Sequence, residues 1–137
     1  MNHATALLEQ GRELRAGGRF TAAVTLLEAH LHLFASVPEI HALLGQIYEQ
    51  LGNHTAAIRH LERAIALAPN LLDALFTLGV AHQMSGNHLH AIELFDRVIE
   101  EAPTLPHTYR YRGLALQELG RDRKSTRLNS VTASYLV

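Results

Sequence analysis

The ten histidines are the most chemically versatile side chains of this 137-residue chain. Imidazole nitrogens bind metal ions and transfer protons near neutral pH. Two ligands share one face of a helix when they are three or four residues apart. No two histidines have that spacing, since His30 and His32, like His88 and His90, are two residues apart. We therefore expect no metal ion and no cofactor, and we expect His54 and His88 to cap turns or to be half-buried.

Motifs of catalysis are also missing from the sequence. It contains no GxSxG nucleophile motif, no phosphate-binding glycine loop and no HExxH zinc motif. The absence of cysteine excludes disulfides, thiolate metal sites and cysteine nucleophiles. We therefore predict that the chain has no catalytic residues and is not an enzyme.

Charge and hydropathy exclude two further classes of partner. The formal net charge of −1 is too balanced to favour binding to nucleic acid or to an acidic membrane surface. No stretch approaches the roughly 18 apolar residues needed to span a bilayer, and the N-terminal residues lack the features of a secretory signal. The default expectation is a cytoplasmic protein without nucleic-acid or membrane partners.

Arg12 and Arg15 could bind an acidic group, because a guanidinium holds a carboxylate through two parallel hydrogen bonds. The alternative is an ordinary solvated helix face on which these arginines pair with Glu9 or Glu13, and this is the commoner arrangement. Which of the two applies depends on the elements that position the side chains.

Those elements follow from a repeat of 34 residues. Two series of glycines recur at this interval, Gly11, Gly45, Gly79 and Gly113, and Gly18, Gly52, Gly86 and Gly120. Alanines and large apolar residues recur with them at Ala23, Ala57 and Ala91, and at Leu27, Leu61 and Phe95. The first glycine of each pair lies within a helical pattern, where it costs about 1 kcal/mol relative to alanine and so indicates close helix packing. The second glycine stands where that pattern stops and predicts a helix end with positive φ.

The repeat predicts antiparallel helix pairs near 4–17 and 20–34, 38–51 and 54–67, and 72–85 and 88–101, followed by a seventh helix near 106–119. Helices of about 14 residues are roughly 21 Å long and too short to be stable alone in water. Each pair must therefore stack on its neighbours. The expected fold is an all-α superhelix, or solenoid.

The residues of the second unit carry a family resemblance. They are Leu44, Gly45, Tyr48, Gly52, Asn53, Ala57, Leu61, Ala64 and Pro69. Together they resemble the tetratricopeptide repeat, a helix-turn-helix unit of 34 residues. Unit one departs from the family pattern at His30 and Ala35, where alanine and proline are usual. The resemblance covers about residues 4–121 and implies a domain over residues 1–121, with units at 4–37, 38–71 and 72–105 and a truncated fourth unit at 106–121.

The repeat pattern stops after Arg121. The next helix should reach an alanine near position 125, but the sequence reads DRKSTRLNSVTASYLV. A native polar tail and a polar capping helix are two explanations. The run from Asp122 to Ser130 also resembles the in-frame translation of a sequencing-library adapter, so we expect residues 122–137 to be non-native. In that case the last helix has lost its covering partner.

The resemblance also implies a site. In this family the first helix of each pair lines a concave groove that holds a peptide or a helix of a partner protein. Mapped onto this chain, the groove residues are Leu8, Arg12, Leu43, Gln46, Phe76, Val80, Met84, Arg110, Tyr111 and Leu114. The Lys and Asn residues that hold a C-terminal carboxylate in chaperone-binding members are missing, because Arg12, Leu43, Gln46, Thr77 and Val80 stand at those positions. The competing interpretation is that these side chains only pack against a neighbouring helix or a missing downstream domain.

Three functions remain open on the sequence. The first is a protein-interaction scaffold that binds a partner peptide or helix. The second is the N-terminal repeat region of a larger enzyme, because bacterial sulfotransferases, glycosyltransferases and methyltransferases often begin with similar repeats. The third is self-association through the uncovered last helix.

Overall fold

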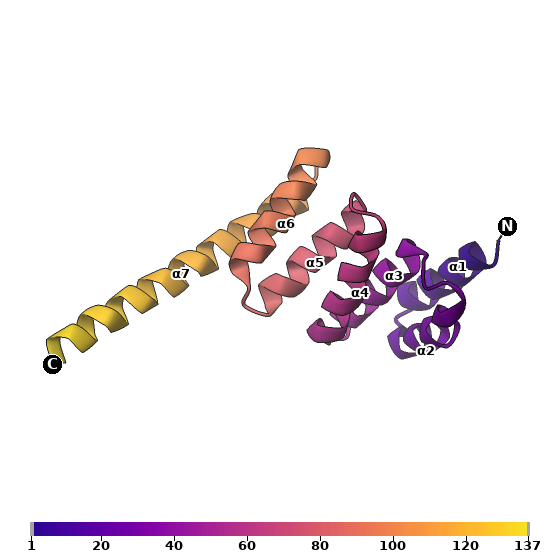
Figure 1. Cartoon of the computed structure of the whole chain (residues 1–137), viewed down its shortest axis with the longest axis horizontal. Helices are drawn as coiled ribbons and strands as arrows, with labels where there is room; N and C mark the ends of the chain where they lie inside the picture. Colours follow the sequence, from indigo (N-terminus) through magenta and orange to yellow (C-terminus); the bar gives the residue numbers. More distant parts are fainter. Residues whose placement is uncertain (1, 137) are drawn as a thin grey trace.

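The chain folds into helices alone over the part that the structure describes. The computed structural model describes residues 2–136, with side chains for residues 2–124. The helices are α1 (His3–Ala16), α2 (Phe20–His30), the short 3-10 helix η1 (Leu31–Leu33), α3 (Pro38–Gln50), α4 (His54–Leu67), α5 (Leu72–Met84), α6 (His88–Glu101) and α7 (Pro106–Leu136). Figure 1 shows them as a row of helix pairs that ends in the long projecting α7. The predicted all-α solenoid is confirmed, and no helix within residues 2–136 is long and apolar enough to cross a membrane.

The first glycine of each unit allows two helices to approach closely, as its position inside a helix predicts. A Cβ atom on Gly45 would lie 2.7 Å from Cδ2 of Leu61 and closer still to Cγ. A Cβ atom on Gly79 would lie 2.6 Å from the Phe95 ring. Leu61 and Phe95 are both fully buried. The missing side chain on α3 or α5 therefore makes room for the large side chain on the partner helix.

The second glycine of each unit ends a helix in the three complete units. Gly52 has φ +81° and Gly86 has φ +87°, and Gly18 also has a positive φ. The left-handed backbone closes the helix and reverses the chain. The next helix then begins after Asn53, whose side chain accepts a hydrogen bond from the backbone N–H of Ala56 at 3.2 Å.

The core is shared between neighbouring units. Ala57, Leu61 and Ala64 on α4 lie in one buried cluster with Ala74 and Leu75 on α5. Because a single helix pair leaves this apolar face open, the next pair covers it. Stacking therefore supplies the stability that helices of this length lack on their own.

The end of unit one differs slightly from the prediction. We expected its second helix to reach residue 34, but α2 ends at His30 and the chain continues as η1. The Phe34 backbone N–H bonds to the Leu31 carbonyl, which is the tighter 3-10 spacing. Unit one has Ala35 in place of the usual proline, so its chain winds into a loose last turn instead of stopping sharply.

The predicted end of the seventh helix is wrong. We expected it to stop at residue 119, before Gly120, but α7 continues to Leu136. Gly18, Gly52 and Gly86 are followed by a segment with an apolar face to bury, whereas Ser125 and Asn129 stand where the repeat would place alanine and a large apolar residue. Without such a face nothing favours folding back, and the helix continues through its own hydrogen bonds. The side chains of 125–137, most of the expected non-native segment, lie outside the described residues.

One side of α7 has no covering helix over residues 106–124. A Cβ atom added to Gly113 would meet nothing within 4 Å, unlike those on Gly45 and Gly79. Leu114 and Leu116 are 47% and 46% exposed, while Ala115 on the opposite side is fully buried. The loss of a partner helix, expected from the repeat register, is thus visible in the packing of α7.

Amide exchange should reveal this difference. We expect the amides of residues 106–120 to exchange faster than those of residues 38–100, because fewer buried contacts hold α7 in place. Hydrogen exchange followed by mass spectrometry on the monomeric protein measures this directly. Equal protection of the two regions would show that α7 is as well held as the interior helices.

Candidate functional site

The first helices of the four units form one continuous face. α1 packs on α3, α3 on α5 and α5 on α7, so these helices lie side by side. A hollow of about 440 Å³ opens on this face. Its lining residues are Arg15 from α1, Gln46, Glu49 and Gln50 from α3, Asp73, Phe76, Thr77 and Val80 from α5, and Tyr111 from α7. Every lining residue comes from the first helix of a unit.

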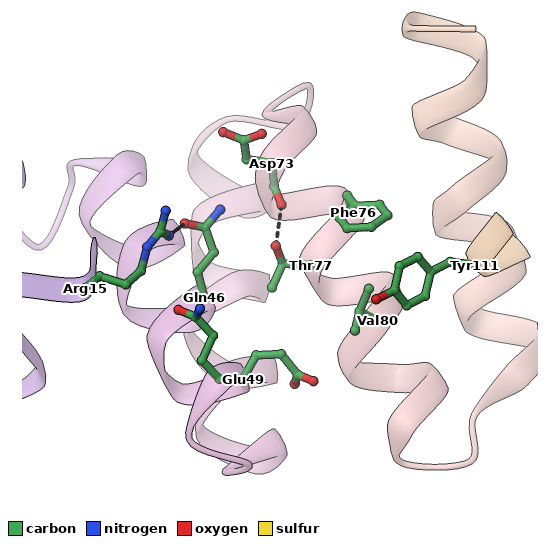
Figure 2. Close-up of a pocket in the computed structure, with 9 residues that line it drawn as sticks. Arg15, Gln46, Glu49, Asp73, Phe76, Thr77, Val80 and Tyr111 are labelled. Carbon is green, nitrogen blue, oxygen red and sulfur yellow. Dashed lines mark hydrogen bonds between the residues drawn. The ribbon is translucent and has the colours of Figure 1, made fainter. Parts of the chain in front are cut away.

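One end of this hollow is apolar and aromatic. Figure 2 shows Phe76, Val80 and Tyr111 grouped between α5 and α7. The rings of Phe76 and Tyr111 meet edge to face, with centroids 5.4 Å apart and planes at 85°. Phe76 also lies 5.8 Å from the buried Phe95 ring, measured between centroids. The core therefore fixes the apolar end, which offers a half-buried surface to an apolar side chain.

The other end is polar. The Arg15 guanidinium donates a hydrogen bond from Nη1 to Oε1 of Gln46, which links α1 to α3 (Figure 2). Glu49 accepts a hydrogen bond from Nδ1 of His54 at 2.7 Å. Asp73 is exposed at the centre of the hollow, and its carbonyl accepts a hydrogen bond from the Thr77 hydroxyl at 2.8 Å. This end can therefore hold the polar groups of an extended chain.

A second hollow continues the same face toward the N-terminus. It measures about 280 Å³ and is lined by Arg12, Arg15, Glu39, Ala42, Leu43, Gln46, Leu71 and Asp73. Three residues, Arg15, Gln46 and Asp73, line both hollows. The two hollows together are called the groove here, and the groove runs from α1 to α7.

The structure brings some of the predicted site residues together and separates others. Gln46, Phe76, Val80 and Tyr111 line the first hollow, while Arg12 and Leu43 line the second. Leu8 and Leu43 are 9% and 3% exposed and belong to the core cluster of the first two units, so little of either can touch a partner.

The remaining predicted residues lie outside both hollows. They are Met84, which is 62% exposed, Arg110 and Leu114. Gln50 and Leu71 line the hollows although we did not predict them, because neither occupies one of the mapped groove positions.

The histidines serve packing and turns. Nδ1 of His54 bonds to Glu49, and Nδ1 of His88 lies 2.9 Å from Oε1 of Gln83, so each joins the two sides of a turn as expected. Within the described residues, no three His, Cys, Asp or Glu side chains lie close enough to hold a metal ion.

Two histidine pairs escaped the sequence analysis. The rings of His82 and His90 lie 4.2 Å apart between centroids, and Nδ1 of His41 lies 3.4 Å from Nδ1 of His60. Burial, and then the neighbouring His90, lower the pKa of His82. Spacing along one helix cannot reveal such pairs, because each joins two different helices.

Comparison with solved structures supports the same architecture. The MamA protein is 29% identical and has a TM-score of 0.80, over 98% of this chain and 82% of that one. An O-GlcNAc transferase mutant from Thermobaculum terrenum is 26% identical with a TM-score of 0.77, over 82% of this chain and 22% of that one. The first tetratricopeptide domain of Spaghetti (RPAP3), bound to the HSP90 peptide SRMEEVD, is 20% identical with a TM-score of 0.82, over 85% of this chain and 93% of that one. No curated protein matches the chain significantly.

Two family models match the sequence directly. Both describe tetratricopeptide repeats, one over residues 8–71 and the other over residues 50–115. Together they cover most of the chain and the three helix pairs from α1 to α6. The glycine packing and the turn geometry follow the same repeat. The chain therefore belongs to the tetratricopeptide repeat family.

Proposed function

We propose that the chain is a non-catalytic scaffold that binds a segment of a partner protein, a peptide or a helix, in the groove. The observation that carries this proposal is the origin of the lining residues. All of those in the first hollow come from α1, α3, α5 and α7, although these helices are separated in sequence by α2, α4 and α6. The repeat thus produces one shared surface that no single unit could form.

The chemistry of the groove favours a partner segment with mixed character. An apolar side chain of the partner can pack against Phe76, Val80 and Tyr111, where it loses contact with water. The polar end can form hydrogen bonds with the backbone or polar side chains of the same segment through Arg15 and Gln46. Because the core holds the aromatic rings in place, little ordering of the groove opposes binding.

The groove does not support capture of a chaperone C-terminus. A peptide of HSP90 is bound by the RPAP3 domain, but the likeness to that domain shows the fold alone. In this chain Thr77 and Val80 occupy two of the positions where the family's clamp uses Lys or Asn, and Leu43 occupies a third and is buried. We therefore propose a partner segment recognised mainly through an apolar anchor.

A displayed library of random dodecapeptides supplies probes for the groove. Peptides selected on the full chain should lose at least tenfold in affinity for the Val80→Lys variant, because a charge at the half-buried apolar end opposes entry of an apolar side chain. Leu89→Lys is the matched control, since Leu89 is 56% exposed on α6, away from the groove. Fluorescence anisotropy measures both affinities. Equal loss in the two variants, or no loss in either, would refute the groove as the binding site.

A second candidate function is the repeat region of a larger enzyme. The observation in its favour is the likeness to the Thermobaculum terrenum O-GlcNAc transferase, in which the matched part is 22% of the chain. Sequencing the native gene beyond the codon for Arg121 separates the two functions. A sulfotransferase, glycosyltransferase or methyltransferase domain in that frame would favour the enzyme, and further repeats alone would exclude it.

Self-association is a third candidate, supported by the uncovered side of α7. Exposed Leu114 and Leu116, beside the open position at Gly113, could be covered by a second copy of the chain. Sedimentation equilibrium at high protein concentration tests this. A monomer under those conditions would exclude it.

A further inference from the structure

Two buried histidines from different helices face each other in the second unit. His41 on α3 and His60 on α4 are each only 6% exposed. Their Nδ1 atoms lie 3.4 Å apart, and their rings are stacked with centroids 5.6 Å apart. The pair lies beside α2 of the first unit, because His60 also contacts Glu28. It therefore belongs to the junction between units one and two.

The partner of each remaining ring nitrogen determines where the protons are. Nε2 of His41 lies 2.8 Å from the carbonyl oxygen of Ala35, which can only accept, so this nitrogen donates. Nε2 of His60 lies 3.1 Å from Oε1 of Glu28, and the Tyr48 hydroxyl donates to the same oxygen at 2.9 Å. Hydrogen bonds from two donors favour the ionised carboxylate, so Nε2 of His60 also donates.

These assignments create a conflict at the Nδ1 atoms. A neutral imidazole with its proton on Nε2 has a lone pair on Nδ1. Two neutral rings would therefore place two acceptors against each other in a site closed to water, at the cost of two unsatisfied polar atoms. A proton on one of the two Nδ1 atoms removes the conflict, because one ring then donates to the other.

We propose that His41 and His60 share a single proton between their Nδ1 atoms, and that binding of a second proton weakens the junction between the first two units. The singly charged pair is balanced by the carboxylate of Glu28, so the junction holds one positive and one negative charge. A second proton would put two positive charges on stacked rings and remove the acceptor. Acid would then loosen the contact of α2 with α3 and α4.

The other groups around the pair act in the same direction. Burial is the main reason why the pKa of His60 is lowered from 6.5, and His41 and Arg59 lower it further, while Glu28 raises it. Burial also raises the pKa of Tyr48, followed by its hydrogen bond to Glu28, so this phenol stays a neutral donor. Glu28 is therefore the one anion among these neighbours that offsets added positive charge.

The sign of the pH dependence follows from linkage. Because folding lowers the pKa of His60, its contribution to stability is present above the unfolded value of 6.5 and is lost as the pH falls below it. The shared proton has the opposite sign, since the folded pair binds it more tightly than the unfolded chain does, and its contribution is lost at alkaline pH. The junction should therefore be most stable near neutral pH.

Nuclear magnetic resonance of the imidazole nitrogens tests the shared proton on the full chain. At pH 7 we expect both Nε2 atoms to be protonated and both Nδ1 resonances to lie between the protonated and unprotonated positions. Two unprotonated Nδ1 atoms at that pH would overturn the proposal. So would a stoichiometric metal ion in the purified protein, found by elemental analysis, because the metal would then occupy the place of the proton.

The pH dependence of unfolding gives an independent test. For one excluded proton, the folding equilibrium constant of the wild type should fall by up to tenfold per pH unit below 6.5, relative to His60→Gln, whose amide can still donate to Glu28 but cannot bind a proton. His32→Gln, at an exposed position in η1, should follow the wild type. Parallel curves for the wild type and His60→Gln would refute the exclusion of a second proton. If His60→Gln does not fold, the resonance measurement on the wild type still decides.

Discussion

Replacement of Phe95 with alanine should lower the free energy of unfolding by about 3–5 kcal/mol. The Phe95 side chain is fully buried and fills the space that Gly79 leaves open on α5. Its ring also supports Phe76 and Tyr111, at centroid distances of 5.8 and 6.2 Å. The substitution would remove both the buried apolar surface and the contacts across a cavity that the helices cannot close. Urea unfolding followed by circular dichroism measures the loss.

Leu89→Ala is the control for this effect. Leu89 lies on the same helix, α6, but is 56% exposed, so its truncation should change the free energy of unfolding by only about 0.5 kcal/mol. A similar cost for the two substitutions would mean that Phe95 does not fill the space between α5 and α6. That result would contradict the repeat packing described above.

Gly45→Ala should destabilise the protein by about 1–3 kcal/mol, although alanine is the better helix former. The new methyl group would overlap the fully buried Leu61, whose Cδ2 atom lies 2.7 Å from the added Cβ position. Leu61 cannot move away easily, because it is packed within the cluster that joins α4 to α5. Steric overlap therefore outweighs the gain in helix propensity.

Gly113→Ala provides a matched test with the opposite expected sign. Gly113 occupies the same repeat position one unit beyond Gly79, but nothing lies within 4 Å of an added Cβ atom. This substitution should stabilise the protein by up to about 1 kcal/mol through helix propensity alone. Urea unfolding of both variants measures the difference. Destabilisation by Gly113→Ala would indicate that another helix covers α7.

Much of the fold was predictable because each mark of the repeat has its own physical cause. Gly52 predicted a left-handed helix end, Gly45 predicted a close helix approach, and Leu61 predicted the side chain that fills the space. These marks recur every 34 residues, so one unit predicts the others. Helix boundaries in units two and three therefore differ from the predictions by only one residue.

The prediction failed where the cause lies in contacts between units. Leu43 occupies a position that faces the groove in the family, but its side chain packs against Gly11 of the preceding unit and is buried. The contact between His41 and His60 depends on how α4 lies on α3, which spacing within either helix does not determine. Gly120 shows that a glycine alone does not end a helix, because reversal also needs an apolar face on the segment that follows.

The most direct test of the proposed function is to map a bound peptide onto the protein. A dodecapeptide selected on the full chain is titrated into 15N-labelled protein, and the amide chemical shifts are followed. We predict that the largest shifts occur on α1, α3, α5 and α7, around Gln46, Phe76 and Tyr111. Shifts concentrated on α2, α4 and α6 would contradict the groove as the surface that binds partner proteins.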